Sequence, residues 1–274
     1  MLYIKTTAAP STDLHYVDVG SGQPVVLIHA WPVSHRMWES QIAALTDAGY
    51  RCIAYDRRGF GDSGKPGGGY DYDSFTSDLN DLMTQLDVRD AALVGFSMGG
   101  GEVARYVARY GTSRVAKAAL LGSVTPFLLK TADNPNGVDR SVFDGMIEGV
   151  KKDRIAFLEQ FLPNYYNYEA GKGMSADLIP FSKWMAWNAS PLGTARCITA
   201  FGTTDFRADL KSLTVPTLVA HGDADRIVPF EISSKRAHEQ IKGSRLEVIP
   251  GAPHGFAATH GQRTSELLLD FLGS

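Results

Sequence analysis

Six short, almost continuously apolar runs alternate with segments of helical periodicity, and this alternation constrains the fold of the chain more than any other feature. Runs that are apolar at nearly every position are typical of parallel strands covered on both faces. Strands that alternate with helices predict an α/β sheet with helices on both faces. The expected strands cover residues 24–29, 51–55, 91–96, 115–123, 216–222 and 245–251, and the expected helices lie at about 36–47, 74–87, 98–110, 230–241 and 260–272.

This pattern changes at the start and in the middle of the chain. Strand-like runs at 2–6 and 14–22 are joined by a short loop, so we expect the mostly parallel sheet to open with an antiparallel hairpin. From about residue 126 to residue 212 no strand-like run appears, and helical or irregular sequence rich in Phe, Tyr and Trp takes over. We therefore expect a helical cap at 126–212, inserted between two strands of a core formed by 1–125 and 213–274.

Charge and composition exclude several classes of partner. The chain has 274 residues, of which 44% are hydrophobic, and its formal net charge of −3 leaves no electrostatic footprint for a nucleic acid or an anionic membrane surface. The N-terminal sequence lacks the apolar core of a signal peptide, and no window is long and apolar enough to span a bilayer. We expect a cytoplasmic protein without nucleic-acid or membrane partners.

No residue pattern points to a metal or a redox site. Cys52 and Cys197 form no close pair and neither lies at a strand-to-helix turn, so we expect both to be buried apolar groups. No cluster of His, Cys and Asp has metal-ligand spacing, so no metal or other cofactor is expected. The glycine-rich segment 64–71 does not link a strand directly to a helix, which favours a flexible surface loop over a phosphate cradle.

A serine lies between two glycines where the strand at 91–96 becomes the helix at 98–110. Gly95, Ser97 and Gly99 form the pattern G-x-S-x-G, and a strand before it and a helix after it are the context of a nucleophile elbow. The flanking positions must be small because the two backbones approach closely there, and the serine oxygen then projects above the sheet edge. The alternative is an ordinary N-cap serine with glycines for packing.

A serine nucleophile needs a base and an acid that holds the base. Asp225 and His254 follow the strands at 216–222 and 245–251, so they lie on loops at the same sheet edge as Ser97, in the chain order Ser, Asp, His. Asp225 is preferred over Asp223, which is better placed to close the turn after Gly222. The other histidines are expected within or ending strands (His15, His29 and His221) or on exposed helix surface (His35, His238 and His260).

An oxyanion on the substrate needs N–H donors aimed at it. Two are expected at this edge of the sheet. One is the backbone N–H of Met98, the residue after the serine, and the other is the backbone N–H of Trp31 in the loop after the strand at 24–29. The Trp31 side chain itself is compatible with an ordinary apolar loop residue.

Several segments together resemble one family along nearly the whole chain. They are HAWPVSHRMWE, AYDRRGFGDSG, LVGFSMGGGEVARY, CITAFGTTDFR, HGDADRIVPFE and APHGFAATH, and they resemble the α/β-hydrolase enzymes called cofactor-free bacterial haloperoxidases or perhydrolases, and the related aryl esterases. The resemblance implies the α/β-hydrolase fold, a catalytic triad of Ser97, Asp225 and His254, and an oxyanion hole from the N–H groups of Trp31 and Met98. It also implies an apolar acyl pocket lined by Trp31, Val124, Phe161, Phe201 and Ile227, although Phe161 and Phe201 could instead pack only within the cap.

The resemblance further implies a reaction. In such enzymes a carboxylic acid or ester acylates the serine, and water or hydrogen peroxide then releases an acid or a peracid. The peracid oxidises halide outside the enzyme, which gives haloperoxidase activity without haem or metal. Pro32 resembles the perhydrolase members, in which proline places the preceding carbonyl to accept a hydrogen bond in the peracid-forming step, and its peptide bond is a candidate for the cis form. Resembling enzymes form trimers or dimers of trimers, which implies a homo-oligomer of the same kind for this chain.

The chain departs from the family pattern at Ala30, where the family usually has glycine. Either this position needs a left-handed backbone, which alanine adopts only at a cost, or it has ordinary dihedrals and the methyl group trims the pocket. Two other functions stay open, which are amide or γ-lactam hydrolysis with the same triad and a slow-turnover small-molecule receptor. Dehalogenase and epoxide hydrolase chemistry are disfavoured because they need a carboxylate where this chain has Ser97.

Overall fold

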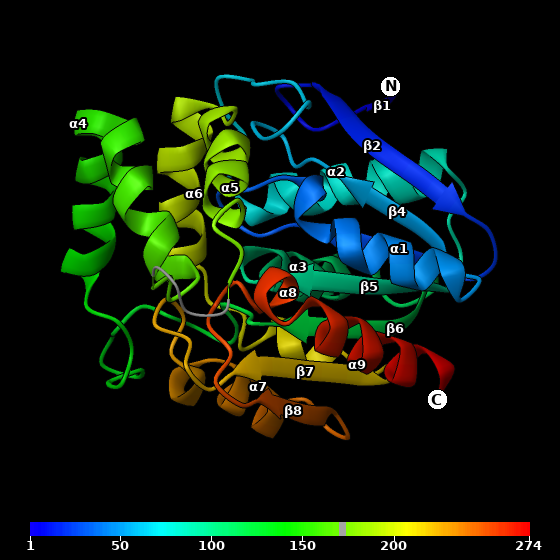
Figure 1. The fold of residues 1–274 in the computed structure, drawn as a ribbon. Helices are drawn as coiled ribbons and strands as arrows, with labels where there is room; N and C mark the ends of the chain where they lie inside the picture. The colour runs from blue at the N-terminus through cyan, green and yellow to red at the C-terminus, as the bar shows by residue number, and fades with distance from the viewer. Residues whose placement is uncertain (170–173) are drawn as a thin grey trace.

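The computed structural model describes residues 1–169 and 174–274, and its centre is one eight-stranded sheet in the order β1-β2-β4-β3-β5-β6-β7-β8 (Figure 1). Strand β2 pairs antiparallel with β1 and β4, and the remaining pairs are parallel. This confirms the predicted sheet, including the antiparallel hairpin at its start. The strands are β1 (Leu2–Lys5), β2 (Asp13–Gly20), β3 (Pro24–Ile28), β4 (Arg51–Tyr55), β5 (Ala91–Phe96), β6 (Val115–Leu121), β7 (Thr217–Gly222) and β8 (Arg245–Ile249).

Helices cover both faces of the sheet, as predicted. Successive strand residues point to opposite faces, so Leu93 of β5 joins the core shared with α2 and α3, whereas Val94 joins the core shared with α1 and α9. Figure 1 shows α1 and α9 in front of the strands and α2 and α3 behind them. These helices are α1 (Glu39–Asp47), α2 (Tyr72–Gln85), α3 (Met98–Tyr110) and α9 (Gly261–Gly273).

One predicted helix is broken in the structure. Residues 230–241 were expected to be continuous, but they form the 3-10 turn η3 (Phe230–Ile232) and the short helix α7 (Ser234–Gln240). Ser233 between them has φ −118° and ψ −102°, which is not helical. Its hydroxyl donates to the carbonyl of Pro229 at 2.7 Å, and such a local side-chain bond competes with the helical hydrogen-bond pattern. Two other helices likewise gain a short first segment, η1 (His35–Trp38) before α1 and α8 (Phe256–Thr259) before α9.

The segment between β6 and β7 contains helices and no named strand among its described residues. It consists of α4 (Arg140–Tyr165), α5 (Leu178–Trp187), α6 (Pro191–Thr203) and the 3-10 turn η2 (Asp209–Ser212). In Figure 1 the helices α4, α5 and α6 gather beyond the end toward which β7 points. They are therefore positioned to cover the carboxyl edge of the sheet. We propose that residues 126–212 form a cap on a core made of residues 1–125 and 213–274. No helix in the described residues is long and apolar enough to cross a membrane.

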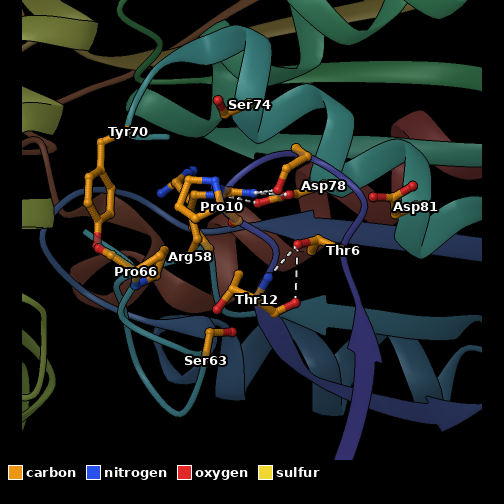
Figure 2. Close-up of polar contacts among 12 residues, drawn as sticks. Thr6, Pro10, Thr12, Arg58, Ser63, Pro66, Tyr70, Ser74, Asp78 and Asp81 are labelled. Atoms are coloured by element: carbon orange, nitrogen blue, oxygen red, sulfur yellow. Dashed lines mark hydrogen bonds and ion pairs between the residues drawn. The ribbon is translucent and has the colours of Figure 1, made fainter. Parts of the chain in front are cut away.

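A buried ion pair joins three separate segments near the N-terminus (Figure 2). The Arg58 guanidinium donates to both carboxylate oxygens of Asp78 on α2 at 2.6 Å, and it also donates to the carbonyl of Pro10 at 3.3 Å. The glycine-rich segment 64–71 forms a loop, as predicted, but this loop packs against the guanidinium of Arg58. A Cβ at Gly69, where φ is +77°, would lie 2.2 Å from Nη1 of Arg58. Burial raises the pKa of Asp78 to about 6 although the hydrogen bonds from Arg58 oppose the shift, so the pair is ionised above neutral pH.

Removing one partner of this pair should destabilise the fold strongly. We expect Asp78→Asn to lower the free energy of unfolding at pH 8 by ~3 to 5 kcal/mol, because the charge of Arg58 stays buried without a counter-ion. Urea denaturation followed by circular dichroism measures this change. Asp73→Asn is the matched control, since Asp73 lies on the same helix but its side chain is 62% exposed, and the loss should be ~1 kcal/mol or less. Equal losses in the two variants would contradict the assignment.

Candidate active site

Ser97 lies on a strained turn between β5 and α3. Its φ of 54° and ψ of −114° are unusual for a residue other than glycine. A Cβ at Gly95 would lie 2.2 Å from the carbonyl oxygen of Gly99, and a Cβ at Gly99 would lie 2.5 Å from the carbonyl oxygen of Ile28. Both glycines are therefore required by the close approach of strand and helix. The side chain of Ser97 makes no hydrogen bond to the first turn of α3, which argues against the alternative that Ser97 is an ordinary N-cap residue.

The structure brings His254 and Asp225 to Ser97. The Nε2 atom of His254 lies 2.9 Å from Oγ of Ser97, and its Nδ1 atom lies 2.6 Å from Oδ2 of Asp225. Asp223 is exposed and accepts the backbone N–H of Gly251 at 2.6 Å instead. Of the two acids considered from the sequence, Asp225 is thus the one in contact with the imidazole.

The Asp225 carboxylate is buried and fully hydrogen-bonded. Its Oδ1 accepts the backbone N–H groups of Ile227 and Val228 at 2.8 and 2.9 Å, and its Oδ2 lies 3.1 Å from Nε2 of His221. Burial would raise the pKa of Asp225, but the charge of His254 and the hydrogen bonds from both imidazoles hold it well below its usual range. Asp225 is therefore ionised at neutral pH and can hold His254 with Nδ1 protonated.

Aromatic side chains complete the surroundings of His254. The ring of Tyr165 lies perpendicular to the imidazole with centroids 4.9 Å apart, and Phe96 makes a second edge contact at 5.7 Å. The side chain of His254 is only 1% exposed. These contacts restrict the rotation of the imidazole and shield its hydrogen bonds from water. Tyr165 and His221 were not predicted as neighbours of the triad from the sequence, although the position of His221 at the end of β7, four residues before Asp225, was an available signal.

A cavity of about 180 Å³ opens over Ser97 and His254. Its wall includes all the residues predicted for the acyl pocket. Pro32, which was predicted to act in the peracid-forming step, is buried and is not part of this wall. Phe161 and Phe201 contact the ring of Trp31, with centroids 5.0 and 5.5 Å apart, so they do not pack only within the cap. Some lining residues were not predicted from the sequence, and these are Leu128, Val138, Val142, Phe143, Met146, Arg226 and Val228. The four-residue spacing of Val138, Val142 and Met146 was a usable signal for three of them.

The loop after β3 supplies the remaining expected groups. The indole of Trp31 donates to the carbonyl of Thr194 on α6 at 3.1 Å, which ties this loop to the helices above the site. The peptide bond between Trp31 and Pro32 is cis. Ala30 does not have a positive φ, so the left-handed backbone that would be costly for alanine is absent at this position.

Comparison with known proteins places this architecture in a family. The family model for the α/β hydrolase fold matches residues 23–260. The chain belongs to the α/β-hydrolase fold family. The crystal structure of a bromoperoxidase from Bacillus anthracis is 47% identical, covers 100% of both chains and superposes with a TM-score of 0.94. A non-heme chloroperoxidase from Kitasatospora aureofaciens is 42% identical over 97% of this chain and 98% of its own, and a bifunctional esterase/perhydrolase from Acinetobacter calcoaceticus is 37% identical over 98% of this chain and 99% of its own.

The predictions for cysteine and histidine have mixed outcomes. Both cysteines are free and buried, and burial raises the pKa of each thiol to about 12, as expected of apolar core groups. The prediction that His35 lies on exposed helix surface was wrong. His35 is buried because Asp56, from the end of β4, accepts both its Nδ1–H and its backbone N–H at 2.8 Å. His238 and His260 are partly buried rather than exposed.

One group of side chains in the described chain could hold a metal ion. The ligand atoms of His15, His35 and Asp56 lie within 4.8 Å of one another, although they come from three elements and no sequence spacing links them. The carboxylate of Asp56 already accepts two hydrogen bonds from His35 and one from the backbone N–H of Asp62 at 2.8 Å. Hydrogen bonds therefore account for His35 and Asp56, whereas the buried Nδ1 atom of His15 lies 3.3 Å from Oδ2 of Asp56 and makes no hydrogen bond.

A neutral histidine supports the loop that carries Trp31. The Nε2 atom of His29 accepts the backbone N–H of Arg57 at 2.9 Å, so its Nδ1–H donates to the carbonyl of Ala30 at 2.7 Å. Burial, together with the charge of Arg57, lowers the pKa of His29 to about 3. Protonation of Nε2 would remove the bond from Arg57, so the folded chain needs the neutral imidazole.

The folded protein should therefore lose stability as the pH falls below the unfolded pKa of histidine. The native state binds fewer protons at His29 than the unfolded state between pH ~6.5 and ~3, so stability rises with pH in this window, by up to ~1.4 kcal/mol per unit from this group. We expect the unfolding free energy of His29→Asn, whose amide can still donate to Ala30, to change less between pH 6.0 and 4.5 than that of the wild type. Urea titrations at four pH values measure both slopes, and identical slopes would refute the role of His29.

Proposed function

We propose that this chain is a serine hydrolase of small carboxylic esters that also transfers acyl groups to hydrogen peroxide. The observation that carries the proposal is the unbroken hydrogen-bond chain from Ser97 through His254 to Asp225 at the floor of an apolar cavity. A serine hydroxyl needs such a base to become a nucleophile, and the base needs a fixed tautomer. No metal or other cofactor has a step in this reaction.

In the acylation step, Oγ of Ser97 attacks the ester carbonyl carbon while its proton passes to Nε2 of His254. The oxyanion that forms accepts hydrogen bonds from the backbone N–H groups of Trp31 and Met98, neither of which has an acceptor within the described chain. Collapse of the tetrahedral intermediate breaks the bond to the alkoxide, which takes the proton from His254 and leaves as the alcohol. The acid Asp225 stabilises the imidazolium throughout and keeps its own charge.

In the second step, water or hydrogen peroxide attacks the acyl-enzyme. His254 accepts the proton of the attacking molecule and returns a proton to Oγ of Ser97 as the acyl bond breaks. Water gives a carboxylic acid, and hydrogen peroxide gives a peracid. The peracid then transfers an oxygen atom to a halide ion in solution, which yields the carboxylic acid and hypohalite. This sequence accounts for related proteins that carry the names of haloperoxidases and of an esterase/perhydrolase.

Loss of the serine or of the correct acid should remove acyl transfer. We expect Ser97→Ala to lower kcat for 4-nitrophenyl acetate by ~10⁴-fold or more, and Asp225→Asn by ~10⁴-fold, because asparagine holds the wrong imidazole tautomer. Asp223→Asn is the matched control from the same loop and should lower kcat less than threefold. Circular dichroism verifies the fold of each variant. Wild-type turnover near zero, or comparable losses at Asp223 and Asp225, would refute the proposal.

Pro32 is proposed to favour the peroxide reaction by placing the Trp31 carbonyl to accept a hydrogen bond from the attacking peroxide. Loss of one such bond is worth ~2- to 10-fold in rate. We therefore expect Pro32→Leu to lower the ratio of peracetic acid formation to phenyl acetate hydrolysis by that factor. Both rates are measured on the same preparation, so a general loss of active enzyme cancels. A ratio equal to that of the unmodified protein would remove this role for Pro32.

A further inference from the structure

Arg226 is an unpaired cation beside the candidate triad. Every other arginine of the chain makes at least one hydrogen bond or ion pair within the described structure, such as Arg236 with the Oδ1 atom of Asn134 at 2.6 Å. Arg226, which lies within the described residues, has neither, and it is exposed. An arginine that no acid of its own chain neutralises is available to an anion from outside.

The same residue lies at the opening of the cavity over Ser97. Arg226 is both part of the cavity wall and exposed to solvent, whereas Ser97 at the floor is only 6% exposed. No Asp, Glu or Lys contributes to that wall, so Arg226 is its one permanently charged residue in the described chain. The wall therefore offers an anionic group that enters the cavity one permanently charged partner, and that partner is Arg226.

Hydrogen bonds to Asp225 fix the backbone position of Arg226. The carboxylate of Asp225 accepts the N–H groups of Ile227 and Val228, so the backbone on both sides of Arg226 is held against a buried, immobile group. Asp225 does not neutralise Arg226, because its two oxygens are already occupied by these amides and by the imidazoles of His221 and His254. The loop therefore holds the backbone of Arg226 at a constant place relative to Ser97, and from there the side chain contributes to the cavity wall.

We propose that Arg226 selects ester substrates whose acyl arm ends in a carboxylate, that is, half-esters of short dicarboxylic acids. This inference rests on the proposed acyl-transfer function and names the substrate class of the same site. The ester carbonyl lies at Ser97, the methylene groups contact the apolar wall, and the free carboxylate meets the guanidinium at the opening. Arginine suits this role because its planar fork can donate two parallel hydrogen bonds to one carboxylate.

The size of the cavity favours a short acyl arm. Its volume of about 180 Å³ is close to the ~150 Å³ of an apolar cavity that holds benzene. An acyl arm with three methylene groups is of similar bulk and leaves its terminal carboxylate near the exposed end. A glutaric acid half-ester is therefore the first compound to test.

The kinetic test compares an anionic ester with a neutral one of the same shape. Monomethyl glutarate and methyl 5-methylhexanoate differ in having a terminal carboxylate or a terminal isopropyl group, and acid release is followed by pH-stat titration at low salt. We expect the ratio of kcat/KM for the anionic ester to that for the neutral ester to fall 10- to 100-fold in Arg226→Gln, as for loss of a charge-assisted hydrogen-bond pair. Added salt should reduce the wild-type ratio, because the cation is at the solvent edge.

Two control variants sharpen the kinetic result. Arg263→Gln removes an exposed arginine of α9 with a carboxylate 3.8 Å away and should leave the ratio as in the wild type. Arg226→Lys keeps the charge without the fork and should give an intermediate ratio. A ratio in Arg226→Gln equal to that in the wild type would overturn the proposal.

A binding test separates this inference from the proposed function. Monomethyl glutarate is titrated by calorimetry into Ser97→Ala and into the double variant Ser97→Ala, Arg226→Gln, so that no turnover is needed. We expect the dissociation constant to rise 10- to 100-fold in the double variant. Equal dissociation constants would refute the role of Arg226 even if ester hydrolysis is observed. Failure of the wild type to hydrolyse either ester would refute the proposed function, while a weakened affinity would still support the anion site.

Discussion

The close approach of β5 and α3 at Ser97 is the constraint on which the rest of the site depends. Glycine at positions 95 and 99 lets the helix backbone reach the strand backbone and the carbonyl of Ile28. The turn between them is then so tight that Ser97 adopts a positive φ. Ser97 directly precedes α3, but its side chain does not cap that helix. The strain is tolerated because the amide of Ser97 also donates to the carbonyl of Leu121 on β6 at 2.8 Å.

The parallel sheet explains why residues distant in sequence meet at this turn. Trp31, Ser97, Val124, Asp225 and His254 each follow the carboxyl end of a strand by a few residues, and parallel strands bring those ends to one edge. The positions of Trp31, Ser97, Asp225 and His254 were predictable because strand ends and G-x-S-x-G are local signals, whereas Val124 was predicted only through the family resemblance. The sequence also separated Asp225 from Asp223 correctly with respect to contact with His254, since a turn next to Gly222 uses the nearer acid.

Features set by contacts between distant side chains were not predictable in the same way. His35 reads locally as a surface helix residue, and only its pairing with Asp56 at the end of β4 buries it. Segment 64–71 reads as an unconstrained loop, and the guanidinium of Arg58 beneath Gly69 is what it packs against. The break at Ser233 depends on one hydroxyl that competes with the helix. In each case the structure depends on a contact with a polar group that the periodicity and spacing of the sequence do not predict.

Charge balance at Asp225 links the proposed reaction to the proposed selectivity for anionic esters. A buried carboxylate at Asp225 must be compensated, and the structure does this with two imidazoles and two amides instead of a nearby arginine. Had Arg226 been the partner of Asp225, it would have lowered the basicity that His254 needs and would have been unavailable to a ligand. Because the amides of the next two residues supply the compensation, the same hydrogen bonds that keep Asp225 ionised also hold the backbone of Arg226 at the opening of the cavity. The proposed reaction and the proposed recognition therefore share one structural support, and a change in the loop that disturbs one should disturb the other.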